Sequence, residues 1–80
     1  MKFSDHFEFY SSKVRPYLTK DLCERIVENP IKIKKQANGR TRYWGWSDTF
    51  NKYIRVVVLE DNETILTAHF DRNFKMEEEV

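Results

Sequence analysis

The sequence predicts an α+β fold in which two N-terminal helices pack on one face of a four-stranded antiparallel sheet. Two observations support it. Apolar residues recur at helical spacing through residues 1–30, and from residue 31 to residue 70 they alternate with polar ones at a period of two. Because 80 residues build one core at most, we expect a single domain over residues 1–75, followed by an acidic tail at 76–80.

The first helix is predicted to begin at a cap formed by Ser4 or Asp5 and to end near Arg15, before a proline. A strand over residues 3–10 is the alternative, since aromatic and polar residues also alternate there. In the helical interpretation one face is apolar and comprises Phe3, Phe7, Tyr10 and Val14.

The second helix has clearer signals. Thr19 is a good N-cap, and Asn29-Pro30 ends the segment. Its apolar stripe comprises Leu22, Cys23, Ile26 and Val27. The lone Cys23 cannot form an internal disulfide and is interpreted as a small core residue.

Strands are predicted from Ile31 onward and over residues 40–46, 53–59 and 64–70. Asn38-Gly39 supplies the residues that a two-residue primed hairpin turn requires. In the last strand, strict alternation places Ile65, Thr67 and His69 on one face. With both helices on one side of the sheet, the other face is left open, and its side chains are the candidates for function.

Charge is concentrated in one segment. Residues 31–46 carry five positive charges and no negative one, whereas the whole chain has a net charge of only +1. Lys and Arg neutralise phosphates, and flat aromatic rings stack on unpaired bases, so single-stranded RNA is the first partner to test. The predicted RNA-binding residues are Lys32, Lys34, Lys35, Arg40, Arg42, Trp44 and Trp46.

Each part of this set also has a structural interpretation. Lysines on an edge strand protect a sheet from aggregation without binding any ligand. Arg40, Arg42, Trp44 and Trp46 are predicted to share one face of their strand. That face is a binding platform if it is solvated, and part of the core if the tryptophans point inward.

His69 is the candidate for proton transfer, because imidazole is the side chain whose ordinary pKa lies near neutrality. RNA cleavage by the 2′-hydroxyl needs a base, an acid and cations around the phosphorane. The candidate catalytic residues are therefore His69, Arg42, Arg55 and Arg72. The alternatives are a structural hydrogen bond for His69 and an Asp71–Arg72 ion pair.

Other classes of function are poorly supported. The two histidines lie far apart in sequence, and no zinc-ligand spacing, phosphate loop or dinucleotide fingerprint is present, so neither a metal nor a cofactor is expected. No apolar run is long enough for a membrane span, so we expect no membrane partner and a reducing cytoplasmic location.

Several motifs resemble the RelE-like toxin superfamily: ENP at the end of the second helix, NGR and RYW in the basic segment, and KYIRVVVLEDNETILTAHFDRNFK. The resemblance implies a barnase-related α+β fold. It also implies a metal-independent endoribonuclease that acts on messenger RNA, on the ribosome in some members, and is neutralised by an antitoxin. Arg42, Arg55, His69 and Arg72 stand at matching positions, but no catalytic Tyr follows Phe74.

Two further hypotheses of function remain open in addition to the ribonuclease. In one, the basic hairpin of residues 31–46 forms a non-catalytic module that binds RNA, DNA or an acidic protein segment. In the other, the open sheet face or edge pairs with another protein by strand addition.

Overall fold

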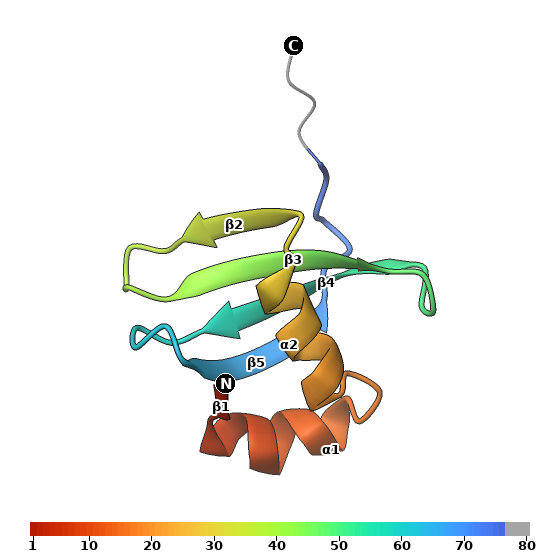
Figure 1. The fold of residues 1–80 in the computed structure, drawn as a ribbon. Helices are drawn as coiled ribbons and strands as arrows, with labels where there is room; N and C mark the ends of the chain where they lie inside the picture. Colours follow the sequence, from red (N-terminus) through yellow and green to blue (C-terminus); the bar gives the residue numbers. More distant parts are fainter. Residues whose placement is uncertain (77–80) are drawn as a thin grey trace.

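Five strands form one mixed sheet in the order β1-β5-β4-β3-β2, as Figure 1 shows. The computed structural model describes residues 1–76, so residues 77–80 of the predicted acidic tail lie outside the described residues. The strands are β1 (Lys2–Phe3), β2 (Lys32–Lys35), β3 (Thr41–Ser47), β4 (Lys52–Val58) and β5 (Thr64–Phe70). The α+β class and four of these strands agree with the prediction.

The four-stranded antiparallel sheet was incomplete as a prediction, because β1 adds a fifth, parallel strand beside β5. The backbone N–H of Lys2 donates to the Glu63 carbonyl at 2.9 Å, and that of Ser4 donates to the Ile65 carbonyl at 3.0 Å. A two-residue strand is too short to show alternation, so the sequence pattern gives no sign of it.

The first helical segment follows β1 and contains a π-turn. It consists of η1 (Phe7–Ser11) and α1 (Ser12–Val14), which excludes the strand alternative. Ser4 is the cap, since its hydroxyl accepts a hydrogen bond from the Phe7 N–H at 3.1 Å.

The predicted apolar face of this segment is wrong beyond Phe7. Tyr10 and Val14 are about half exposed, whereas Ser11 is buried. A π-turn contains more residues than an α-turn. The residue that follows Phe7 on the buried side is therefore Ser11 rather than Tyr10.

The second helix, α2 (Lys20–Glu28), agrees with the prediction. The Thr19 hydroxyl accepts from the Leu22 N–H at 3.3 Å, and Cys23 and Ile26 are buried. Burial raises the pKa of the Cys23 thiol to about 12, as expected for a core residue. None of the helices in the described part of the chain is long and apolar enough to cross a membrane.

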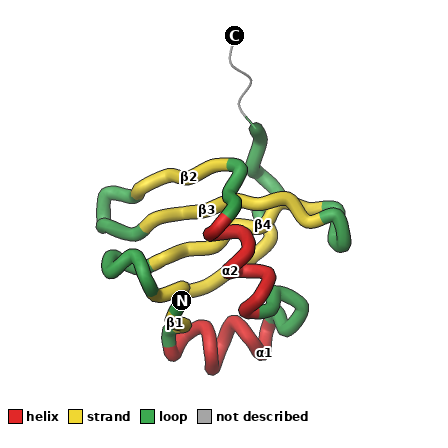
Figure 2. The backbone as a smooth tube through the Cα atoms, viewed as in Figure 1, coloured by secondary structure: helices red, strands yellow, loops and turns green. Residues whose placement is uncertain are grey.

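The two helices do not share one face, which corrects the predicted arrangement. Helix α2 crosses β3 and β4 on one face, whereas the first helical segment runs along the edge of the sheet beside β5 (Figures 1 and 2). Strand β1 covers only the first two residues of that edge. The first helix covers the next part, where the Thr67 hydroxyl lies 3.5 Å from that of Ser11.

The core fills the space between α2, the first helical segment and one face of the sheet. Its buried residues are Phe7, Leu18, Cys23, Ile26, Ile54, Val56, Val58, Ile65 and Ala68. Gly45 allows α2 to approach β3 closely, because a Cβ atom there would lie only 2.7 Å from Cγ1 of Ile26. The opposite face of the sheet has no helix on it in the described chain (Figure 1).

The β2–β3 turn has three loop residues and not the predicted two. The Gln36 N–H donates to the Arg40 carbonyl at 2.7 Å, so residues 37–39 form the loop. Gly39 has a φ of 90°, whereas Asn38 is not among the residues with positive φ. A primed two-residue turn needs positive φ at both central residues. Asn38 instead accepts the Arg40 N–H at its side-chain oxygen, at 3.0 Å.

A β-bulge in β5 corrects one predicted face. Val57 pairs with Thr67 but Val58 pairs with Ile65, so Leu66 is an extra residue between them. The extra residue reverses the alternation. Ile65 therefore points into the core while His69 faces the open side, although the two were predicted to share a face.

Candidate functional site

Three rows of side chains cross the open face, because antiparallel registers align residues on neighbouring strands. Two rows are cationic, and the third pairs Trp46 with Tyr53. The first cationic row runs through Lys32, Trp44, Arg55 and His69, and the second through Lys34, Arg42, Val57 and Thr67. The register thus brings three of the four predicted catalytic residues, Arg42, Arg55 and His69, onto one surface.

Arg55 is the centre of this surface and is only 26 % exposed. Its Nη2 lies 2.7 Å from Nε2 of His69, and its Nη1 lies 3.6 Å from Oδ2 of Asp71. Its Nε is buried and has no hydrogen-bond partner among residues 1–76. Burial lowers the pKa of Arg55, the nearby Arg42 lowers it further, and Asp71 opposes both. Arg55 is thus a guanidinium with too little compensating negative charge.

His69 is held in its neutral form. A guanidinium can only donate, so Nε2 of His69 accepts from Arg55 and the ring proton is on Nδ1. Burial lowers the pKa of His69 to about 4, and the positive charges of Arg55, Arg15 and Arg42 contribute to the decrease. At neutral pH the imidazole is therefore not available as an acid in its charged form. The lone pair on Nε2, which would act as the base, already accepts the hydrogen bond from Arg55.

Arg42 is held from the β2–β3 turn. With the amide oxygen of Gln36 turned toward Arg42, it lies 3.2 Å from Nε and 3.1 Å from Nη2. The Gln36 amide is neutral, so it does not compensate the positive charge of Arg42 beside Arg55.

The segment after β5 folds back over the open face. Asp71 accepts a hydrogen bond from Nε1 of Trp44 at 2.9 Å, and the ring of Phe74 stacks on Trp44 at 5.1 Å between centroids. Burial by itself raises the pKa of Asp71, but the bonds from Trp44 and Asn73 and the charge of Arg55 bring it below its ordinary value. Trp44 is consequently 5 % exposed and offers no free ring face for a base.

A pocket of about 340 Å³ lies between this segment and strands β2–β4. Five of the described cations line it: Lys32, Lys34, Arg42, Arg55 and Lys75. The only acidic side chain in its lining is Asp71, which is shared between Trp44 and Arg55. We call this the cationic pocket.

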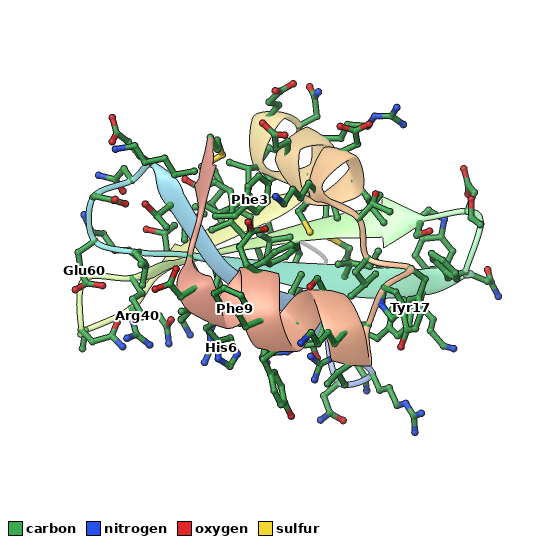
Figure 3. The ribbon with its side chains drawn as sticks, turned by 90° about the horizontal axis from the view of Figure 1, so that it is seen from below. Phe3, His6, Phe9, Tyr17, Arg40 and Glu60 are labelled. Atoms are coloured by element: carbon green, nitrogen blue, oxygen red, sulfur yellow. The ribbon has the colours of Figure 1, made fainter. Side chains whose placement is uncertain are left out.

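Five predicted residues do not line the cationic pocket: Lys35, Arg40, Trp46, His69 and Arg72. Arg40 pairs with Glu60, Nε to Oε1 at 3.5 Å, and Figure 3 shows both at one end of the sheet. Lys35 pairs with Thr41, whose side chain faces the α2 side, so Lys35 is on the opposite face from Lys34. Arg72 lines a second pocket instead.

The two tryptophans differ in their surroundings. Trp44 is buried under Phe74 on the open face, so it is neither an exposed platform residue nor part of the core cluster between the sheet and the helices. Trp46 is 43 % exposed, with Nε1 donating to Asp48 at 2.8 Å and its ring in a T-shaped pair with that of Tyr53, 4.9 Å between centroids. Of the two, Trp46 can therefore stack on a ligand.

The sequence interpretation missed the contribution of residues 71–75. Asp71 was expected to pair with Arg72 but pairs with Arg55, and Lys75 and Phe74 were given no role. The one available signal was the run of an acid, an aromatic and a lysine directly after β5. It does not reveal that the chain turns back over the sheet.

The arrangement can bind an anion but has little capacity for proton transfer. Cations from three strands and the C-terminal segment converge, while the one imidazole present is neutral and engaged. Within residues 1–76 no three His, Cys, Asp or Glu side chains gather closely enough to hold a metal ion. No protein-family model, curated protein or solved structure matches this chain.

Proposed function

We propose that this protein binds single-stranded RNA through the open face of its sheet, with backbone phosphate in the cationic pocket. The supporting observation is Arg55, a largely buried guanidinium placed between Arg42 and His69 with a buried N–H that has no partner in the described chain. Leaving such a donor unsatisfied costs about 1–3 kcal/mol, and clustered cations repel one another. A bound phosphate offsets the repulsion, which favours a site built for an anion.

Two neighbouring lysines supply a matched test. Lys34 lines the cationic pocket, whereas Lys35, the next residue of the same edge strand, is on the other face. Lys34→Gln and Lys35→Gln change the net charge equally. We expect Lys34→Gln to weaken binding of a fluorescent oligouridine in anisotropy titrations and to reduce the salt slope by about 0.7, the value for one lost phosphate contact.

Lys35→Gln is expected to leave the affinity and the slope nearly unchanged. Equal losses in both variants would mean that RNA responds only to the diffuse charge of the protein. No binding by the native chain at about 50 mM salt would overturn the proposal, because electrostatic binding is strong in that range.

RNA cleavage of the toxin type is the second candidate, favoured by Arg42 and Arg55 in the lining of the cationic pocket and by the contact of Arg55 with His69 on the same sheet face. In this hypothesis Arg42 and Arg55 hold the scissile phosphate and His69 moves a proton, while Arg72 acts from the neighbouring pocket. An antitoxin would neutralise the site by presenting acidic side chains to the same cations. The low pKa of His69 makes binding without cleavage the better-supported function.

A cleavage assay with EDTA present, on free RNA and on translating ribosomes, separates the two candidates. New 5′ ends that appear with the native chain and decrease roughly 10²–10⁴-fold with His69→Ala would assign proton transfer to His69. Intact RNA with both chains, together with normal binding, would leave the non-catalytic function.

A further inference from the structure

A second pocket, of about 330 Å³, lies beside the cationic pocket at the end of β4 and β5. Its walls include Trp46, Tyr53, Phe70 and Phe74, and the cations Lys52 and Arg72 also line it. Its volume is at the lower end of the roughly 300–1,000 Å³ that small-molecule sites occupy. We call it the aromatic pocket.

The aromatic walls are fixed in orientation. Nε1 of Trp46 is already bonded to Asp48, the rings of Trp46 and Tyr53 form a T-shaped pair at 67°, and Tyr53 meets Phe74 at 66° with 4.9 Å between centroids. An indole has two faces, and one T-shaped contact covers at most one of them. Since Trp46 is 43 % exposed although large apolar residues are normally covered, that face is suited to a flat ligand.

The two pockets share a wall. Asp71 and Phe74 line both of them, so a ligand in one pocket is adjacent to a ligand in the other. The cationic pocket suits a phosphate group, and the aromatic pocket with its two cations suits a planar, electron-rich ring. A nucleotide joins a phosphate group to a flat ring, so its two parts match these two adjoining pockets.

We infer that the aromatic pocket holds one unpaired base of the bound strand, stacked on Trp46, while the phosphate of the same or the next nucleotide occupies the cationic pocket. This inference rests on the proposed function. It assigns Arg72 and Lys52 to the base side of the site, and it makes the protein selective for unpaired strands because a paired base cannot leave its stack without cost.

The test compares an oligouridine with a strand of equal length and charge in which every base is replaced by an abasic ribose. Trp46→Leu should weaken oligouridine binding roughly 5- to 150-fold, the range for loss of one stacked base, and should leave binding of the abasic strand unchanged. Arg42→Gln should weaken both strands. Phe9→Leu is the matched control, because Phe9 is a 69 % exposed aromatic on the first helix, outside both pockets.

The outcomes separate the inference from the function on which it rests. If Trp46→Leu has no effect, or weakens both strands equally, the base pocket is overturned while RNA binding stands. If the native chain binds neither strand, both fall. If a Glu/Tyr copolymer binds in place of RNA and Trp46→Leu abolishes this, the pocket belongs to an acidic protein segment and the inference is overturned. Circular dichroism of each variant confirms that the exposed substitution leaves the fold intact.

Discussion

At the scale of single residues, His69 has a strongly lowered pKa. Burial disfavours protonation of the imidazole most, the charges of Arg55, Arg15 and Arg42 disfavour it further, and Asp71 favours it. Its folded-state pKa of about 4 is below the ordinary 6.5. Between these values the unfolded chain binds more protons than the folded chain, so the free energy of unfolding decreases as the pH falls.

We therefore expect the native chain to lose thermal stability between pH 6.5 and pH 4 through His69, in addition to any loss from carboxylates. His69→Gln removes the titration but keeps a polar side chain. Its melting temperature should decrease less over the same pH interval, as measured by circular dichroism in matched buffers. Identical pH profiles for the two chains would contradict the lowered pKa.

Asp71 has two structural tasks that substitutions can separate. It accepts the Nε1–H of buried Trp44 and compensates part of the charge of Arg55. Asp71→Asn keeps an acceptor oxygen for Trp44 but removes the negative charge. Asp71→Ala removes the acceptor as well, so the indole N–H of Trp44 loses its hydrogen bond to Asp71. Trp44 is only 5 % exposed.

We expect Asp71→Ala to be less stable than Asp71→Asn by about 1–3 kcal/mol in urea unfolding, the cost of a buried donor without a partner. RNA affinity should rise in Asp71→Asn, because a carboxylate at the cationic pocket repels phosphate. Equal stabilities would show that the Trp44–Asp71 bond contributes little.

At the scale of elements, α2 reaches the sheet only because β3 has a glycine at the crossing. A Cβ atom at Gly45 would lie 2.7 Å from Cγ1 and 3.1 Å from Cγ2 of Ile26. Gly45→Ala should therefore destabilise the fold by about 1–3 kcal/mol through overpacking. Ile26→Ala alone should destabilise it by creating a cavity.

The double variant Gly45→Ala/Ile26→Ala removes the clash and partly fills the cavity. Its loss of stability should thus be smaller than the sum of the two single losses, by roughly 0.5–3 kcal/mol in a double-mutant cycle. Strict additivity would mean that the helix can shift away from β3 at little cost.

At the level of elements, a sequence pattern predicts features that depend on local signals. Residues 64–70 and the Thr19 cap were placed correctly, because alternation and capping are local signals. The β-bulge at Leu66, the π-turn at Phe7–Ser11 and the parallel pairing of β1 were not predicted, because each depends on tertiary contacts that change the local period.

The candidate site shows the same division between local signals and tertiary contacts. Regular alternation along β3 and β4 accounts for Arg42 and Arg55 on the open side of the sheet, whereas the face of His69 depends on the bulge at Leu66, which the sequence pattern does not show. The burial of Trp44 and the pairing of Arg40 with Glu60 were not predicted. Both depend on where a loop or a terminal segment lies, which alternation does not encode.

At the scale of the whole molecule, charge is distributed unevenly between two regions. The cationic pocket lies on the open face, and residues 77–79 are three consecutive glutamates that begin two residues after Lys75, itself part of the pocket. Consecutive Cα atoms are about 3.8 Å apart, so two residues of any chain span at most about 8 Å, which is comparable with the Debye length of about 10 Å at 0.1 M salt.

Replacing all three glutamates by glutamine raises the net charge from +1 to +4. We expect RNA affinity to increase, and the gain to shrink as salt rises from about 50 mM toward 1 M, where the screening length falls to about 3 Å. Anisotropy titrations of an oligouridine at several salt concentrations measure both effects.

The control carries the same change of net charge at another place: Asp21→Asn, Glu24→Gln and Glu28→Gln on α2, the helix that covers the opposite face of the sheet. Salt screens the interaction between exposed charges that are more than about one Debye length apart. This variant should therefore gain less affinity than the tail variant at 0.1 M salt. Equal gains would mean that the total charge governs RNA binding. A larger gain in the tail variant would locate the bound strand near Lys75, as expected for phosphate in the cationic pocket.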